Sequence, residues 1–160
     1  MVKIPLSQGQ FALVDDEDFE WLNQWKWSAG KRRNTFYAFR SVSIKGEQFH
    51  IYMHRLITEA PKGKETDHAN GNGLDNRRRN LRVCTVRQNQ YNQAKRKNSL
   101  SQYKGVSLNK RVKVKKWVAG ITKNGKNIHL GYFKDEIDAA KAYDRKAKEL
   151  CGEFAKLNFG

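Results

Sequence analysis

Short runs in which apolar and polar residues alternate dominate the first part of the chain. Segments 10–14, 25–30 and 35–42 are apolar or alternate in this way, as is typical of short strands. Segment 15–24 lies between the first two and begins with four acidic residues. Acidic side chains favour the first turn of a helix, because the helix dipole is positive there, so a short helix is predicted. The pattern indicates a small strand-rich unit.

A hairpin-like turn at Gly46 is followed by a helix predicted over 50–60, which Pro61 ends. The aromatic side chains of this part are expected to fill the core and cover the sheet faces rather than to stack on bases. They are Trp21, Trp25, Trp27, Phe36, Tyr37 and Phe39.

A different pattern begins at residue 65. Segments 65–68 and 81–85 predict two short strands, and the segment between them, 69–80, is dense in the Asn, Gly and Asp residues that form turns. Segment 85–94 predicts a helix that Thr85 caps. The predicted order is therefore strand, long loop, strand, helix.

The last third predicts an antiparallel meander of three strands with one covering helix. Segments 103–110, 115–125 and 126–133 predict the strands, with Asn124-Gly125 as the hairpin turn. Segment 135–152 predicts an amphipathic helix with acidic residues at its start and a glycine at its end. Its predicted apolar stripe consists of Ile137, Ala140, Tyr143, Ala147 and Leu150.

The 160 residues suit one ordinary domain or two small ones, and the patterns favour two, of the α+β class. We expect the first domain at 1–94 and the second at 103–160. The basic, polar stretch 95–102 has no apolar period and is predicted to link them.

Two sequence features bear on the compartment. No apolar run approaches the roughly 20 residues that span a bilayer, and the first residues lack the pattern of a signal peptide, so an intracellular location is expected. Cys84 and Cys151, the only cysteines, are too few for a disulfide framework or a Cys-rich zinc site. Both are expected to be small core residues.

The net charge of +16 is far beyond what solubility requires and predicts an anionic partner. The first 60 residues hold 8 Lys or Arg and 7 Asp or Glu, whereas the rest of the chain holds 24 and 9. Between Asp75 and Asp135 there are 17 basic residues and no acidic one. Solvated faces usually intersperse both signs, so nucleic acid is the favoured partner. A membrane is disfavoured because no long basic amphipathic helix carries the charge.

The block MHRLITEAPKGKETDHANGNGLDNRRRNLRVCTVRQNQYN, residues 53–92, resembles the HNH endonucleases, particularly the homing endonucleases of phages and introns. Its elements DH, GN, DN and NLR recur in order at matching spacing. The resemblance implies a ββα-metal (His-Me finger) fold with its catalytic core at about 53–92, which matches the strand, loop, strand, helix order. The positions of the family name correspond to His68, Asn80 and Asn89, the last being an amide variant that also occurs within this subfamily.

Phosphodiester cleavage requires an activated water, a charge stabiliser at the phosphorus and help for the departing 3′ oxygen. In the implied site, Asp67 and the side-chain oxygen of Asn89 are hard ligands for one Mg²⁺ or Mn²⁺ ion. His68, with an ordinary pKa of about 6.5, is the expected general base. Neighbours on a strand face opposite sides, so Asp67 and His68 can both serve only if the strand ends or bends there. The resemblance implies that Asn80 holds the loop and orients His68.

Each of these residues also has a structural interpretation. The Asp-His pair could be part of a turn, and Asn89 could be an exposed helix residue. His54 is favoured as a packing residue, with a role in the site left open. Three further asparagines of the block, Asn70, Asn72 and Asn76, are expected to be turn formers.

Basic residues near the implied site are expected to contact DNA phosphates without reading sequence. They are Arg77, Arg78, Arg79, Arg82 and Arg87. Trp117 could contact DNA or pack, and both alternatives remain open. Further DNA contacts are expected from the basic residues on or beside the C-terminal sheet, which are Lys104, Arg111, Lys113, Lys115, Lys116 and Lys123.

Residues 103–159 resemble the APETALA-two/ethylene-responsive-factor DNA-binding domain through YKGVSLNK, WVA, LGYF, AAKAYD and KLNF. The resemblance implies that a three-stranded sheet docks in the major groove. Ser107, Gly120, Thr122 and His129 stand where family members often carry Arg, Glu, Arg and Trp. Docking is therefore implied, whereas base preference is not.

These features predict a metal-dependent, site-directed DNA endonuclease of the HNH homing type. It is expected to act on double-stranded DNA in the host cytoplasm as a monomer or weak dimer, with no membrane or small-molecule partner, and to derive from a phage, an intron or another mobile element. Two alternatives stay open: a DNA-binding regulator that retains the nuclease scaffold without activity, and an RNA-binding or RNA-cleaving protein.

Overall fold

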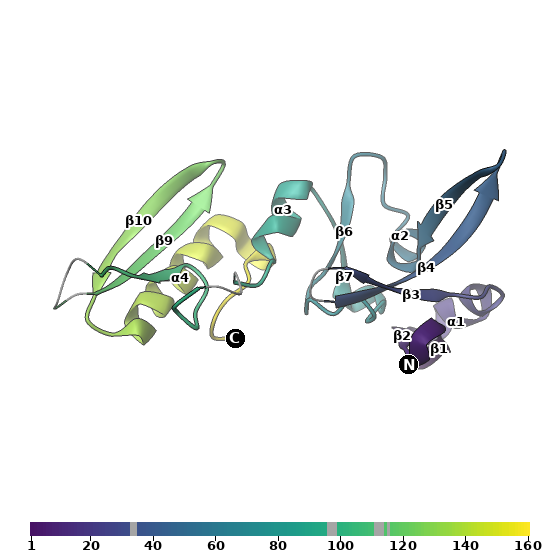
Figure 1. Cartoon of the computed structure of the whole chain (residues 1–160), viewed down its shortest axis with the longest axis horizontal. Helices are drawn as coiled ribbons and strands as arrows, with labels where there is room; N and C mark the ends of the chain where they lie inside the picture. Colours follow the sequence, from purple (N-terminus) through teal and green to yellow (C-terminus); the bar gives the residue numbers. More distant parts are fainter. Residues whose placement is uncertain (33–34, 96–98, 111–113, 115) are drawn as a thin grey trace. The chain divides into compact units, whose positions relative to one another are not determined.

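The computed structural model describes the whole chain except residues 33–34, 96–98, 111–113 and 115. The chain forms two compact units, Met1–Asn89 and Gln90–Gly160. Small antiparallel sheets and few helices make up the described part of both (Figure 1), so the predicted α+β class is confirmed. Three of the predicted DNA-contacting residues, Arg111, Lys113 and Lys115, lie outside the described residues.

The first unit opens with a hairpin of β1 (Val2–Pro5) and β2 (Phe11–Val14), of which β1 has no counterpart among the predicted strands. Helix α1 (Asp16–Asn23) follows, with three acidic residues in its first turn, so the helix predicted from these acids is confirmed. A short 3-10 helix, η1 (Ser7–Gly9), connects the two strands of the hairpin.

A three-stranded antiparallel sheet follows, in the order β3 (Ser28–Arg32), β4 (Thr35–Ile44) and β5 (Glu47–Tyr52). The helix predicted over 50–60 is wrong at its start, since α2 spans only Met53–Thr58. Residues 50–52 pair with β4 instead. The reason is non-local, because the ladder to β4 satisfies backbone groups that a helix would have bonded within itself.

The core of the first unit lies between the N-terminal hairpin, α1, the sheet and α2. Ile4, Val14, Leu22 and Met53 are at most 1% exposed, and Trp27 is 4% exposed. Trp21, Trp25 and Phe36 pack against this core, as predicted for the aromatic residues.

Helix α2 packs against β6 (Glu65–His68) and β7 (Leu81–Cys84). These strands form a two-stranded antiparallel ladder, and the loop between them ends in a 3-10 helix, η2 (Arg78–Asn80). Helix α3 (Val86–Tyr91) follows β7.

The predicted cap of α3 is confirmed. The backbone N–H of Gln88 donates to Thr85 Oγ1 at 3.2 Å, and the N–H of Thr85 donates to Gln88 Oε1 at 2.9 Å. The two side chains thus satisfy each other's backbone donors, the arrangement of a capping box.

The second unit contains a three-stranded antiparallel sheet in the order β10-β9-β8, comprising β8 (Val106–Leu108), β9 (Trp117–Lys123) and β10 (Lys126–Phe133). Asn124 and Gly125 have φ of 53° and 76°, so the predicted hairpin turn is confirmed. Cys84 in the first unit is buried, and Cys151 in the second is half-buried and packs against an apolar cluster.

Helix α4 (Glu136–Cys151) packs on β9 and β10, and a last 3-10 helix, η3 (Gly152–Phe154), follows it. Ile137 was predicted in its apolar stripe, but its side chain is 44% exposed. At 3.6 residues per turn it lies about 100° from the centre of the buried face. That face consists of Ala139, Ala140, Tyr143 and Ala147. No helix among the described residues is long and apolar enough to cross a membrane.

Candidate active site

The side chain of Asn80 holds the loop between β6 and β7. It is 6% exposed, its Oδ1 accepts from the N–H of Asn70 at 3.0 Å, and its Nδ2 donates to the carbonyl of Asp75 at 2.7 Å. In addition, the N–H of Ala69 donates to the Asn80 carbonyl at 2.9 Å. One buried amide therefore ties together two distant points of the loop directly after His68.

A buried carboxylate reinforces the same loop. Asp75 is 2% exposed and accepts from Arg77 at two positions, Nε and Nη2, both at 2.6 Å. The Asn70 side chain donates to the same carboxylate at 2.8 Å. The Arg77 hydrogen bonds hold the pKa of Asp75 below its ordinary value, so the carboxylate is charged when it makes these contacts.

Backbone contacts fix the loop to the rest of the first unit. The N–H of Leu13 donates to the Leu74 carbonyl, and the N–H of Asn76 donates to the Leu13 carbonyl, both at 2.8 Å. On β4, Thr35 Oγ1 accepts from the N–H of Gly73 at 2.9 Å. The loop is thus attached to strands β2 and β4 as well as to itself.

His68 ends strand β6 and is 4% exposed. Its Nε2 lies 3.3 Å from Oδ1 of Asn76, a residue with no exposed surface. Because Asn76 Nδ2 donates to the Leu74 carbonyl at 3.4 Å, its oxygen faces the imidazole, and Nε2 carries the proton. Burial lowers the pKa of His68 from 6.5 despite the opposing effects of Asn76 and Asp67. The ring is therefore neutral at pH 7, the form that can accept a proton.

His54 packs edge-on against His68, with 5.1 Å between the ring centroids. It also stacks on Tyr52 at 5.5 Å and meets Tyr37 at 5.5 Å. Its side chain is 8% exposed, and burial, helped by the charges of His68 and Arg55, lowers its pKa to about 3. His54 is thus a neutral packing partner of His68.

The two faces of β6 meet different helices. Thr66 shares a hydrogen bond of 2.8 Å with Thr58 of α2, and His68 lies against His54 of the same helix. Glu65 and Asp67 alternate with them and lie on the other face. Asp67 is 4% exposed and forms an ion pair with Arg82, its partner across the ladder. The strand ends at His68, as it must if Asp67 and His68 are both to serve one site.

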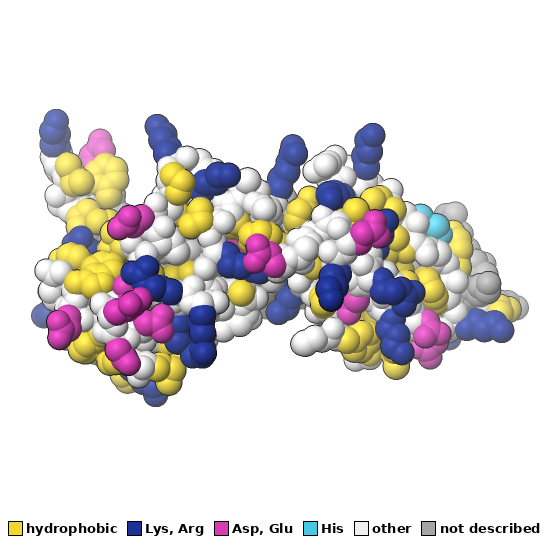
Figure 2. Space-filling model, turned by 180° about the vertical axis from the view of Figure 1, so that it is seen from behind, with side chains coloured by type: hydrophobic (Ala, Val, Ile, Leu, Met, Phe, Trp, Pro, Cys, Tyr) yellow, Lys and Arg dark blue, Asp and Glu magenta, His cyan; other side chains and the backbone are white. Residues whose placement is uncertain are grey.

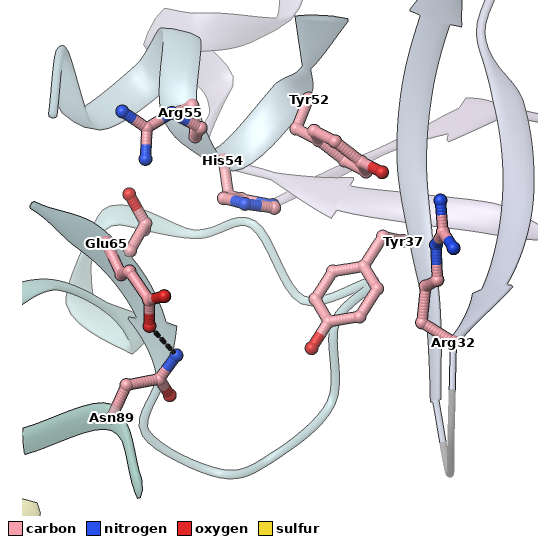
Figure 3. A pocket seen from close by; sticks show the side chains of 8 residues that line it. Arg32, Tyr37, Tyr52, His54, Arg55, Glu65 and Asn89 are labelled. Carbon is pink, nitrogen blue, oxygen red and sulfur yellow. Dashed lines mark hydrogen bonds between the residues drawn. The ribbon is translucent and has the colours of Figure 1, made fainter. Parts of the chain in front are cut away.

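Asn89 on α3 reaches the face of β6 that carries Asp67. Its Nδ2 donates to Glu65 Oε2 at 2.6 Å (Figure 3). The structure therefore brings Asn89 to Glu65, which lies two residues before Asp67 on the same face of β6.

A pocket of about 270 Å³ lies beside these residues (Figure 3). It is lined from both faces of β6, because Glu65 and Thr66 both contribute to it. Among the described strands, β6 pairs only with β7. The lining residues are Arg32, Tyr37, Tyr52, His54, Arg55, Glu65, Thr66 and Asn89.

A family model described as HNH endonuclease matches residues 52–91, which include β6, its loop, β7 and α3. The chain is 31% identical over 154 residues to "Uncharacterized HNH endonuclease L560" of Acanthamoeba polyphaga mimivirus, covering 95% of this chain and 76% of that protein. The chain belongs to the HNH endonuclease family. This membership confirms that the protein is a nuclease and indicates DNA as its substrate.

A second relative of this HNH endonuclease is "Protein 3.8" of Escherichia phage T7. It is 32% identical over 97 residues, which cover 61% of this chain and 78% of the phage protein. No solved structure matches the chain significantly.

HNH nucleases generally use a divalent metal ion, and the side chains here are compatible with one. Among the described residues, no group of three or more His, Cys, Asp and Glu side chains could hold a metal. A Mg²⁺ site, however, needs only one or two carboxylates, with water and substrate phosphate completing the shell. Asp67 and the amide oxygen of Asn89 fit that sparse donor set.

Three of the five arginines predicted to contact phosphate near the HNH site are held by acidic residues. Arg77 pairs with Asp75 and Arg82 with Asp67. Arg78 binds the buried carboxylate of Asp18 through Nε and Nη2 at 2.9 and 2.7 Å. The other two, Arg79 and Arg87, are exposed.

Predicted DNA-contacting lysines of the second unit differ in their surroundings. Lys104 Nζ donates to the Tyr91 carbonyl at 2.6 Å, and burial lowers its pKa to about 8. Lys123 Nζ donates to the Leu150 carbonyl at 2.6 Å, whereas Lys116 is exposed. Trp117 is half-buried and packs against the core between sheet and helix.

Two residues next to the HNH motif residues were missed in the sequence analysis. Asn76 was assigned to a turn, although its side chain contacts His68. Glu65 was given no role, although it binds Asn89. The element DN within the matching block contains Asn76 and was the available signal for it. For Glu65 the sequence offered none.

Proposed function

We propose that the protein is a metal-dependent DNA endonuclease of the HNH homing type. In this proposal, His68 accepts a proton from the attacking water, Asp67 and Asn89 hold one Mg²⁺ or Mn²⁺ ion, and Asn80 keeps the loop in place. When bound, the ion would withdraw charge from the phosphate and the departing 3′ oxygen. The observation that carries the proposal is the buried, neutral His68 next to Asp67 at the end of β6.

The contacts of His68 support its role as the general base. With Nε2 donating to Asn76, the other ring nitrogen, Nδ1, is the one that can take a proton. Asn80 fixes the backbone that follows His68, because Ala69 and Asn70 both donate to it. A base held in this way keeps one orientation and one tautomer, which a positioned proton acceptor requires.

Double-stranded DNA is the proposed substrate, and the second unit is proposed to supply most of the recognition. Its sheet has one face on α4, where Val106, Ala119 and Ile121 are buried. Alternation places Ser107, Val118, Gly120 and Thr122 on the other face. That face is the one expected to enter the major groove in the domain type that residues 103–159 resemble. Figure 2 shows Lys and Arg side chains on the surface of both units, with Asp and Glu side chains among them.

The division into a catalytic module and a recognition module has a physical reason. A metal-assisted cut at a phosphodiester does not depend on the base, so target choice must come from contacts elsewhere. We place the catalytic module at 1–94, the linker at 95–102 and the recognition module at 103–160. A monomer or weak dimer is proposed, and the viral and phage relatives support an origin in a phage or mobile element.

The test uses purified protein, supercoiled plasmid carrying phage DNA, and Mg²⁺ or Mn²⁺ with and without chelator. Cleavage should require the metal and should fall by about 10² to 10⁴-fold in His68→Ala, while DNA affinity stays. His50→Ala, which alters an exposed histidine on β5, is the matched control. Binding without cleavage by the wild type would indicate a regulator instead, and preferred binding of duplex RNA in competition would indicate an RNA-directed protein.

A further inference from the structure

The side chain of Glu65 holds one end of the Asn89 amide. Its Oε2 accepts from Asn89 Nδ2 at 2.6 Å (Figure 3). An ionised carboxylate has only acceptors, so the amide must turn its NH₂ group toward Glu65. Because the amide group is planar, Oδ1 then points away from Glu65.

This choice matters because the two ends of an amide are nearly the same size but chemically opposite. The NH₂ group is a donor and repels a cation, whereas Oδ1 is a hard ligand that Mg²⁺ or Mn²⁺ accepts. Packing alone does not distinguish the two orientations. A partner that only accepts does, and Glu65 is such a partner.

We infer that Glu65 is a positioning residue that presents Oδ1 of Asn89 to the divalent ion. The inference rests on the proposed function, since it gives meaning to Asn89 as a ligand. Partners of this kind typically change metal affinity by about 10 to 100-fold. Glu65 is suited to the role by its place on β6, two residues before Asp67 and on the same face.

The experiment measures Mn²⁺ binding to the full-length protein without DNA, by electron paramagnetic resonance of the free ion. In Glu65→Gln the new amide can either donate or accept, so it no longer sets the Asn89 orientation. Mn²⁺ affinity should fall by about 10 to 100-fold. The urea midpoint of the metal-free protein should stay unchanged. Glu47→Gln, which alters an exposed carboxylate on β5, is the control and should bind Mn²⁺ like the wild type.

A rescue variant gives the sharper test. In Asn89→Asp alone, the new carboxylate lies next to Glu65, where Asn89 Nδ2 was 2.6 Å from Glu65 Oε2. The two carboxylates repel each other, so the proposed metal site should be disrupted. Combined with Glu65→Gln, Asn89→Asp exchanges donor and acceptor: the new amide donates to the new carboxylate, whose second oxygen replaces Oδ1. Mn²⁺ affinity in the double variant should therefore exceed that of either single variant.

A second combination separates positioning from direct ligation. In an Asn89→Ala background, Glu65→Gln should cause no further loss of Mn²⁺ affinity if Glu65 acts through Asn89. A further loss would mean that Glu65 binds the ion itself and would overturn the inference. Wild-type affinity in Glu65→Gln would overturn it as well, while leaving the proposed function intact. No Mn²⁺ binding by the wild type would reject the proposed metal site, and the inference with it.

Discussion

Replacing Asn80 with alanine removes a side chain that bridges two distant points of the loop between β6 and β7. Its amide makes two hydrogen bonds, both to backbone groups: the N–H of Asn70 at 3.0 Å and the carbonyl of Asp75 at 2.7 Å. The first is half-buried and the second is buried. In Asn80→Ala both groups lose this partner.

The cost follows from these two groups. A buried donor or acceptor left unsatisfied costs about 1 to 3 kcal/mol, so the pair costs about 2 to 6 kcal/mol, with the half-buried position favouring about 2 to 4. In a unit of this size, each kcal/mol lowers the melting temperature by about 4 to 8 °C. The first unit should therefore melt about 10 to 30 °C lower in the variant.

Urea unfolding followed by tryptophan fluorescence measures this loss, because Trp21, Trp25 and Trp27 lie in the first unit. Trp117→Phe as a common background removes the signal of the second unit. Asn72→Ala is the matched control from the same loop: Asn72 is exposed, and its side chain accepts one bond, from the N–H of Leu74 at 3.1 Å. Asn72→Ala should lower the free energy of unfolding by less than about 1 kcal/mol. Equal losses in the two variants would refute the claim that the Asn80 amide holds the loop.

Three further changes have defined outcomes. Gly105 has a φ of +74°, and a Cβ there would overlap the Tyr143 ring, so Gly105→Ala should destabilise the second unit by about 2 to 5 kcal/mol in thermal unfolding followed by Trp117. His54 has a pKa lowered to about 3, so below its unfolded pKa of about 6.5 the unfolded chain binds a proton that the folded chain does not. The free energy of unfolding should fall as the pH drops through this window, and His54→Phe should flatten the slope in urea titrations. If the exposed Lys116 contacts phosphate, Lys116→Ala should make the plot of log Kd against log salt shallower by about 1, measured by fluorescence anisotropy on duplex DNA.

Elements set by neighbouring residues were predictable from the sequence. The Asn124-Gly125 turn depends on two residues that accept positive φ, and the cap of α3 depends on Thr85 and Gln88, three residues apart. The start of α2 depends instead on pairing between β5 and β4. Apolar residues at 51–53 suit either a strand or a helix, and only the partner strand decides between them.

The residues of the candidate site also divide into those that the sequence pattern predicts and those that depend on distant contacts. His68 and Asn80 were predictable because a family pattern carries them at fixed spacing, although their catalytic roles stay a prediction. Glu65 was not predictable, since its contact to Asn89 joins residues 24 positions apart. No spacing rule connects a strand residue to a helix residue so far along the chain. Such contacts emerge only when β6, β7 and α3 pack together.

The charged residues show most clearly that the fold, and not the sequence alone, decides which arginines are available to bind phosphate. The stretch between Asp75 and Asp135 contains no acid, which suggests that its arginines are available to DNA. In the fold, acids from outside that stretch reach them: Asp18, which is 60 residues away, binds Arg78, and Asp67 binds Arg82. An arginine in such a pair adds less to phosphate binding, because a phosphate must compete with the carboxylate for the same N–H groups. The acidic residues of α1 thus stabilise the site loop at the expense of its positive charge. We therefore expect exposed cations such as Lys116 to contribute more to DNA affinity than the paired arginines. The salt dependence of DNA binding by Lys116→Ala tests this expectation.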